Sequence, residues 1–178
     1  AGGYNRLTTH IKGRDIENED LVNMPNWLPV YLRINRECWF RCSDVDILFY
    51  RQQLHIYKGM LYRTIRFRDA AGRVTAVNER RIVHMAQPHL AALEIEVTPE
   101  NWSGELEIVS ALDGRVLNDG VSRYRGLSNR HLEPLEAGHF SADAVFLTVQ
   151  TTQSKLRIAQ AARTRLFKGG EHLPDTPS

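Results

Sequence analysis

The sequence predicts an all-β fold, a large antiparallel sandwich of two sheets. Along residues 90–98, apolar residues alternate with polar ones: Leu93, Ile95 and Val97 fall on one face of an extended chain. Turn signals rich in glycine, asparagine and aspartate recur between such runs, and helical periodicity is scarce. Strands that follow one another through short turns, without helices between them, are typical of two packed antiparallel sheets.

The middle of the chain predicts a meander of hairpins. A second strand is expected over 105–109, with Leu106 and Ile108 on one face, after a connection at 98–104 rich in Pro, Asn, Ser and Gly. Further hairpin turns are expected at 58–59, 69–72 and 113–114, each flanked by β-branched or aromatic residues.

Two late strands are predicted at Val145–Val149 and Lys155–Ile158, the second running on to Phe167. The alanines after Gln160 would also suit a helix, but the preceding period of two favours a strand. A tail with two glycines and two prolines follows. We therefore expect one sandwich domain over residues 1–168 and a tail or linker over 169–178.

Composition narrows the class of partner. The 178 residues include 23 basic and 21 acidic ones, and the basic residues are scattered along strands, which argues against a nucleic-acid partner. The chain has no apolar run near the roughly 20 residues of a membrane helix and opens with no charged-then-apolar leader, so we expect no membrane partner and a cytoplasmic location.

The sequence predicts neither a disulfide nor a metal site. In an extended chain Cys38 and Cys42 lie about 13 Å apart, beyond disulfide reach, so both are expected to be free thiols. The seven histidines show no ligand spacing; His84 and His89 are five residues apart around a proline. Nucleophile elbows and phosphate-binding glycine loops are also missing.

Residues 16–29 are the candidate substrate-binding segment. Sugar sites combine planar hydrogen-bonding groups with an aromatic ring, and this segment supplies both. Its acidic residues could also form an acid–base pair, or belong to a solvated loop, and Trp27 could instead pin the loop to the core. The candidate sugar-binding residues are Glu17, Asn18, Glu19, Asp20, Asn23, Asn26 and Trp27.

Three further residues are candidates for an interface with another domain. Trp102 lies in the predicted hairpin connection, where an exposed indole is uncommon without a partner. Tyr124 and His131 lie in a polar stretch without clear periodicity, which could also be a solvated crossover between sheets. Trp39, beside Phe40, is expected in the core.

Four stretches carry a family resemblance: Ala1–Leu7, Glu17–Pro29, Arg63–Arg73, and Pro88–Leu93 with Thr98–Gly104. In this order they resemble the N-terminal β-sandwich domain of glycoside hydrolase family 65, whose members include maltose, trehalose and kojibiose phosphorylases. The match covers most of the chain and is specific for this domain type, but it does not specify the disaccharide.

The resemblance implies a galactose-mutarotase-like sandwich, lacking its first strands, that precedes an (α/α)6 catalytic barrel. In such enzymes inorganic phosphate attacks the anomeric carbon of an α-glucoside disaccharide with inversion, and a glutamate of the barrel protonates the leaving sugar. No catalytic residue and no cofactor are therefore expected in this chain, and its expected partners are its own barrel and a second copy in a homodimer.

Two other functions remain open from the residues alone. The chain could be a stand-alone carbohydrate-binding module. It could also be an aldose 1-epimerase-like enzyme, which needs a histidine and a glutamate that converge on the sugar, and His84 with Glu94 or Glu96 is conceivable.

Overall fold

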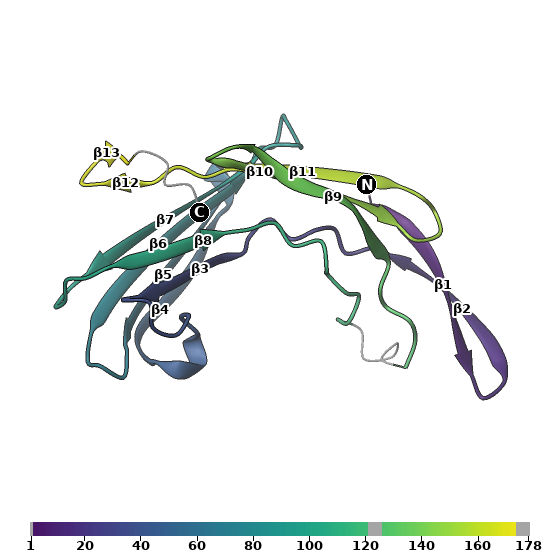
Figure 1. The fold of residues 1–178 in the computed structure, drawn as a ribbon, viewed down its shortest axis with the longest axis horizontal. Helices are drawn as coiled ribbons and strands as arrows, with labels where there is room; N and C mark the ends of the chain where they lie inside the picture. The colour runs from purple at the N-terminus through teal and green to yellow at the C-terminus, as the bar shows by residue number, and fades with distance from the viewer. Residues whose placement is uncertain (1, 121–125, 174–178) are drawn as a thin grey trace. The chain divides into compact units, whose positions relative to one another are not determined.

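The computed structural model describes residues 2–120 and 126–173. Its named elements are antiparallel strands and two short 3-10 turns, so the prediction of an all-β antiparallel fold is confirmed, and the open sheets are consistent with a β-sandwich (Figure 1). The chain forms two compact units. Unit 1 contains Ala1–Val30 and Ser110–Ser178, and unit 2 contains Tyr31–Val109.

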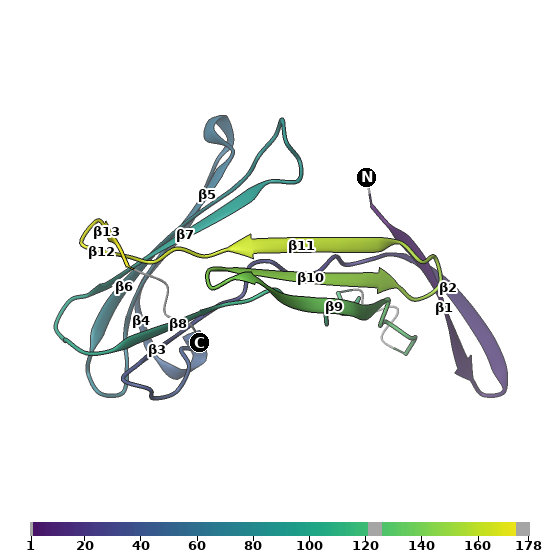
Figure 2. The ribbon, with the colours of Figure 1, turned by 45° about the horizontal axis from the view of Figure 1, so that its top comes forward.

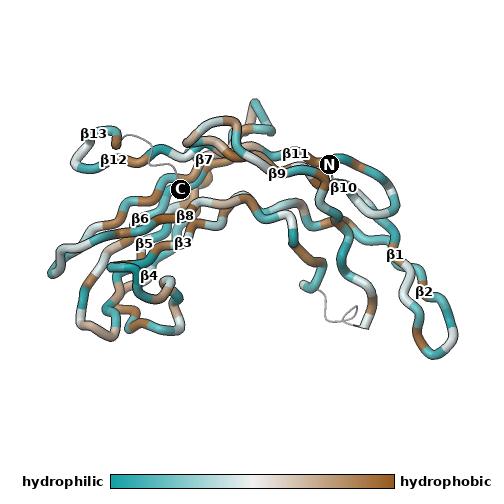
Figure 3. Tube along the Cα trace, viewed as in Figure 1, coloured by the Kyte–Doolittle hydropathy of each residue, from teal (hydrophilic) through white to brown (hydrophobic). Residues whose placement is uncertain are grey.

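The sheet of unit 2 is a meander in the order β4-β5-β6-β7, as predicted. Its strands are β4 (Asp46–His55), β5 (Met60–Arg68), β6 (Val74–Val83) and β7 (Ala91–Pro99). Gly59 adopts φ 60° after the 3-10 turn η2 (Ile56–Lys58), a left-handed conformation that glycine accepts without strain. Hydrophobic and hydrophilic residues are interleaved along these strands (Figure 3), which is the pattern from which the strand at 90–98 was predicted.

The strand predicted over 105–109 exists, but its predicted neighbour is wrong. β8 (Leu106–Ser110) pairs with β3 (Val30–Ile34) and not with β7. Leu32 of β3 packs against Ile65 and Phe67 of the meander, and Leu106 packs on the same cluster. The connection after β7 therefore leads into a second layer that covers the apolar face of the first sheet.

Unit 1 contains a hairpin and a three-stranded sheet. β1 (Tyr4–Ile11) and β2 (Arg14–Leu21) pair along their whole length. The sheet has the order β11-β10-β9, formed by β9 (Leu132–Ser141), β10 (Ala144–Thr151) and β11 (Arg157–Arg163), seen in Figure 2. Its core joins Val22, Leu132 and Val149. The choice of strand over helix after Gln160 is therefore correct as far as Arg163.

One turn prediction fails in unit 1. The predicted hairpin at 113–114 does not form; Asp113 instead makes an isolated bridge to Asn26. The solvated loop considered for Glu17, Glu19 and Asp20 is also absent, since these residues belong to β2. The predicted tail begins inside a short hairpin of β12 (Phe167–Lys168) and β13 (Glu171–His172), whose strands are exposed.

The two cysteines and Trp39 belong to unit 2. Cys38 and Cys42 are exposed free thiols, as predicted. Trp39 is half-buried, and the Arg33 guanidinium lies 4.5 Å from the centre of its ring. Within the described part of the chain, no helix has the length and apolar character needed to cross a membrane.

Candidate sugar-binding groove and its polar clamp

The alternation of β2 divides the predicted binding residues between two faces. Glu17 and Glu19 are exposed and lie 3.5 and 3.6 Å from the guanidinium of Arg6 on β1. Asn18 and Asp20 are half-buried on the opposite face, where the Asn18 side-chain amide donates a hydrogen bond to Asp20 Oδ2. The four residues therefore do not form one site, because neighbouring side chains of a strand point in opposite directions.

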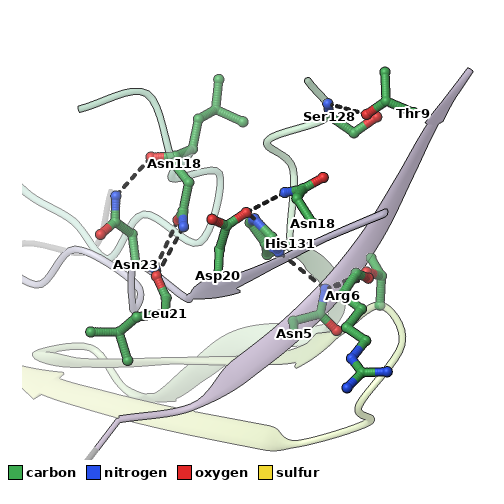
Figure 4. A network of polar contacts seen from close by, with 12 residues as sticks. Asn5, Arg6, Thr9, Asn18, Asp20, Leu21, Asn23, Asn118, Ser128 and His131 are labelled. Atoms are coloured by element: carbon green, nitrogen blue, oxygen red, sulfur yellow. Dashed lines mark hydrogen bonds and ion pairs between the residues drawn. The ribbon is translucent and has the colours of Figure 1, made fainter. Parts of the chain in front are cut away.

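The inner face of the hairpin meets His131, which is only 1% exposed (Figure 4). Asp20 Oδ2 lies 3.2 Å from His131 Nε2, close enough for an ion pair but outside the geometry of a hydrogen bond. On the other side of the ring, Asn5 Nδ2 lies 3.1 Å from His131 Nδ1. Two residues of the hairpin thus hold a histidine that is more than a hundred positions away in sequence.

The contacts of Asn5 fix the tautomer of His131. Asn5 Oδ1 accepts hydrogen bonds from the backbone N–H groups of Gln153 and Ser154, both at 2.9 Å. Because a backbone N–H can only donate, this side-chain atom is the oxygen, and Nδ2 is the donor toward His131. Its two hydrogens serve the shorter contacts, 3.1 Å to His131 Nδ1 and 3.0 Å to Thr152 Oγ1, while the Arg6 carbonyl lies farther away at 3.4 Å. Nδ1 of His131 therefore accepts, and the ring proton lies on Nε2, on the side of Asp20.

Burial lowers the pKa of His131 below its ordinary value, because a charged imidazolium loses its hydration there; the nearby Asp20 carboxylate opposes this shift and does not overcome it. The ring is therefore neutral at pH 7. With its proton on Nε2 and its Nδ1 lone pair used by Asn5, His131 has no nitrogen left to bind a metal. The described residues also contain no group of three or more side chains suited to a metal ion.

A second set of contacts fixes the chain next to the hairpin (Figure 4). Asn118 Oδ1 accepts from the backbone N–H of Asn23 at 2.9 Å, and its Nδ2 donates to the Leu21 carbonyl at 2.9 Å. The backbone N–H of Asn118 donates to the Asn129 carbonyl at 3.0 Å. Ser128 N–H donates to Thr9 Oγ1 at 2.7 Å. Asn118 thus acts as an amide clamp that joins the end of β2 to Asn129.

Beside this clamp lies an open groove with a volume of about 490 Å³. It brings together three of the predicted binding residues, Asn23, Asn26 and Trp27, with the Asp119 carboxylate from a distant segment. The remaining lining residues are Met24, Pro25, Val116 and Leu117.

The groove has the chemical groups of a sugar site. Trp27 is half-buried, while Asn23, Asn26 and Asp119 are exposed. Backbone bonds between Asn26 and Asp113, 2.8 and 2.9 Å long, hold the wall in place. An indole for the C–H face of a sugar ring, together with amides and a carboxylate for its hydroxyls, is a usual composition for binding a carbohydrate. Asp119 was not predicted, because nothing in the sequence indicates that 119 lies beside 23–27.

Trp102 and His131 are not among the residues that line the groove. Trp102 is half-buried and its indole N–H donates to Thr75 Oγ1 at 3.0 Å, so part of its surface is used inside unit 2. Tyr124 lies outside the described residues. Roles of Trp102, Tyr124 and His131 in an interface with another domain stay predictions.

The histidine and the two glutamates considered for an epimerase each contact other residues. His84 Nδ1 accepts from the backbone N–H of Gln87 at 3.0 Å. Glu94 pairs with Arg80, and Glu96 Oε2 lies 3.5 Å from the Asn78 amide. The contacts of the described residues therefore do not join His84 to either glutamate.

The class of protein follows from this all-β fold together with the comparison of sequences. The chain belongs to the N-terminal domain of glycosyl hydrolase family 65, whose profile matches residues 1–177.

Among curated relatives, an uncharacterized glycosyl hydrolase of Mycobacterium tuberculosis is 45% identical over 173 residues, 97% of this chain and 13% of the relative. A kojibiose phosphorylase of Thermoanaerobacter brockii is 28% identical over 153 residues, 86% of this chain and 19% of the relative. A trehalose 6-phosphate phosphorylase of Lactococcus lactis is 28% identical over 179 residues, all of this chain and 22% of the relative. The chain thus spans about a fifth or less of the length of these relatives.

Proposed function

We propose that this chain is the non-catalytic N-terminal domain of an α-glucoside phosphorylase or hydrolase, and that it supports the catalytic barrel and helps to shape the substrate entrance. The family match over residues 1–177 supports the domain assignment, and the names of the phosphorylase relatives support a disaccharide substrate. Inorganic phosphate is the co-substrate in the phosphorylase case, and the enzyme works in the cytoplasm as a homodimer.

The observation that carries the role at the entrance is the groove. Asn23, Asn26 and Trp27 line it together with Asp119, and Asn118 fixes its wall through two side-chain hydrogen bonds of 2.9 Å. A hydrogen-bonded wall with an indole and several polar groups suits contact with a bound disaccharide. No catalytic residue is assigned to this chain, since the general acid of such enzymes is expected in the barrel.

The test is Trp27→Ala in the full-length protein that carries this domain. Loss of a stacking surface is expected to lower kcat/KM for the disaccharide about tenfold, mainly through KM, because an aromatic contact contributes about 1–1.5 kcal/mol. The urea midpoint should stay close to that of the wild type. The matched control is Trp39→Phe, which removes an indole that does not line the groove and should leave kcat/KM unchanged.

A large fall in the urea midpoint of Trp27→Ala would mean that the indole is core. An unchanged kcat/KM in a folded variant would remove the groove from the proposal. The second candidate, a stand-alone carbohydrate-binding module, is favoured by the fact that the groove is formed within unit 1 alone. Titration of the 178-residue chain with kojibiose, trehalose and maltose distinguishes the two: saturable binding that Trp27→Ala abolishes supports the module.

A further inference from the structure

His131 connects three separate parts of unit 1. Through Asn5 it contacts β1, and through Asp20 it contacts β2. Its backbone carbonyl accepts from the N–H of Thr152, and Asn5 Nδ2 also donates to Thr152 Oγ1, at 2.9 and 3.0 Å. The ring is thus the centre of a buried network that fastens the β1–β2 hairpin to the turn between β10 and β11.

This network fits only a neutral ring. A second proton would sit on Nδ1, where it would face the Asn5 N–H across the present 3.1 Å contact. Two donors cannot share a hydrogen bond. Asn5 cannot respond by turning its amide around, because its oxygen is held by the backbone N–H groups of Gln153 and Ser154.

The charged groups around the ring do not remove this conflict. Asp20 lies on the Nε2 side, away from Nδ1. The other face of the hairpin carries Arg6, which pairs with both Glu17 and Glu19. Glu133, two residues after the histidine, already accepts from Lys155 and Gln150, each at 3.0 Å.

We infer that His131 is a proton-operated latch: the neutral ring locks the β1–β2 hairpin onto the β10–β11 turn, and protonation in mild acid releases it. Release breaks the contact between Asn5 and the ring and frees the backbone N–H groups of Gln153 and Ser154. The inference concerns the fold of unit 1 and holds whether or not the groove binds a sugar, so the two proposals fail separately.

The first test compares the stability of the 178-residue chain at pH 6.5 and pH 5.5. If the folded state excludes one proton that the unfolded chain binds with the ordinary histidine pKa of about 6.5, the folding equilibrium constant falls by up to about fivefold over this unit of pH. His131→Asn keeps an acceptor for Asn5 and cannot titrate, so this fall should vanish. The matched control is His10→Asn, at an exposed residue that pairs with Asp15 on the same hairpin, and it should keep the fall.

The second test needs no variant. Nitrogen-15 NMR of the histidine rings at pH 7.5 should show His131 protonated on Nε2 and bare on Nδ1, and amide exchange of Gln153 and Ser154 should accelerate selectively as the pH is lowered to 5.5. In Asn5→Asp, a carboxylate oxygen replaces the donor toward Nδ1, so the pKa of His131 should rise above its wild-type value. A proton found on Nδ1 at pH 7.5, or unchanged exchange of both amides while His131 titrates, would overturn the latch.

Discussion

At the residue scale, the buried carboxylate of Glu79 is expected to matter more for the stability of unit 2 than the exposed ion pairs do. Glu79 on β6 is 4% exposed and accepts from both Arg63 and Arg81, with Arg81 Nε at 2.9 Å. A carboxylate without water depends on such partners, and removing one member leaves the other charges uncompensated. The arginines are 36% and 24% exposed, which limits this penalty.

Glu79→Gln is therefore expected to lower the free energy of unfolding by about 1–3 kcal/mol, since it removes the charge and keeps the shape. Urea denaturation at pH 7 measures the change. Glu94→Gln is the matched control, because it alters the exposed partner of Arg80 on the neighbouring strand, and its midpoint should stay near that of the wild type. Equal losses in both variants would mean that burial of Glu79 has no special weight.

The sequence predicted the residues of the groove better than those of the polar network. Asn23, Asn26 and Trp27 were found because amides and an indole cluster within five positions of the chain. Asn5 and His131 are 126 positions apart, and the sequence around neither residue indicates that its side chain is buried. Local composition carries no information about which distant polar groups will pair, so this contact could not be predicted.

At the element scale, strands were predicted where apolar residues alternate and missed where they do not. β7, β10 and β11 follow an apolar period of two and were identified. β2 is almost entirely polar, so its alternation was invisible in a hydrophobic pattern. The Lys12-Gly13 pair before it could have indicated a turn. In the structure these residues adopt φ 49° and 77°, as the two central residues of a tight hairpin turn require.

Gly114 shows that a turn-like dipeptide can have another cause. It was predicted to form a hairpin with Asp113, yet its backbone lies against the core of unit 1, where a Cβ would come within 2.7 Å of Val149 Cγ1 and 3.0 Å of Leu147 Cδ2. The glycine is needed for close packing and not for a left-handed conformation.

Gly114→Ala is accordingly expected to lower the free energy of unfolding by about 1–3 kcal/mol through overpacking. Thermal or urea unfolding provides the measurement. Gly120→Ala is the control: its Cβ would meet nothing within 4 Å, and it belongs to the same connection between β8 and β9. If the two alanine variants were equally stable, the contact with Val149 would not explain the glycine.

At the scale of the whole molecule, two kinds of titrating group, a buried histidine and several surface glutamates, make the stability depend on pH in different ranges. His131 has a lowered pKa because it is buried, so the unfolded chain binds its proton first and stability begins to fall below pH 6.5. Several carboxyl groups have pKa values lowered mainly by side-chain hydrogen bonds: Arg73 lowers that of Glu37, Arg66 that of Glu100, and Lys155 that of Glu133. Their contribution is present above pH 4.5, the ordinary glutamate value, and is lost as the pH falls through the lowered values.

Stability measured by urea midpoint from pH 8 to pH 3 should therefore fall in two steps, one beginning near pH 6.5 and one below pH 4.5. Salt separates them. The carboxylate pairs are at the surface, so 1 M NaCl, with a Debye length of about 3 Å, should shrink the lower step. The step near pH 6.5 arises because the His131 ring is buried and because a proton on its Nδ1 would face the Asn5 N–H. Salt screens neither effect, so this step should persist. A single step confined below pH 4.5 would mean that His131 titrates alike in folded and unfolded chains, and a salt-sensitive upper step would assign it to surface charges.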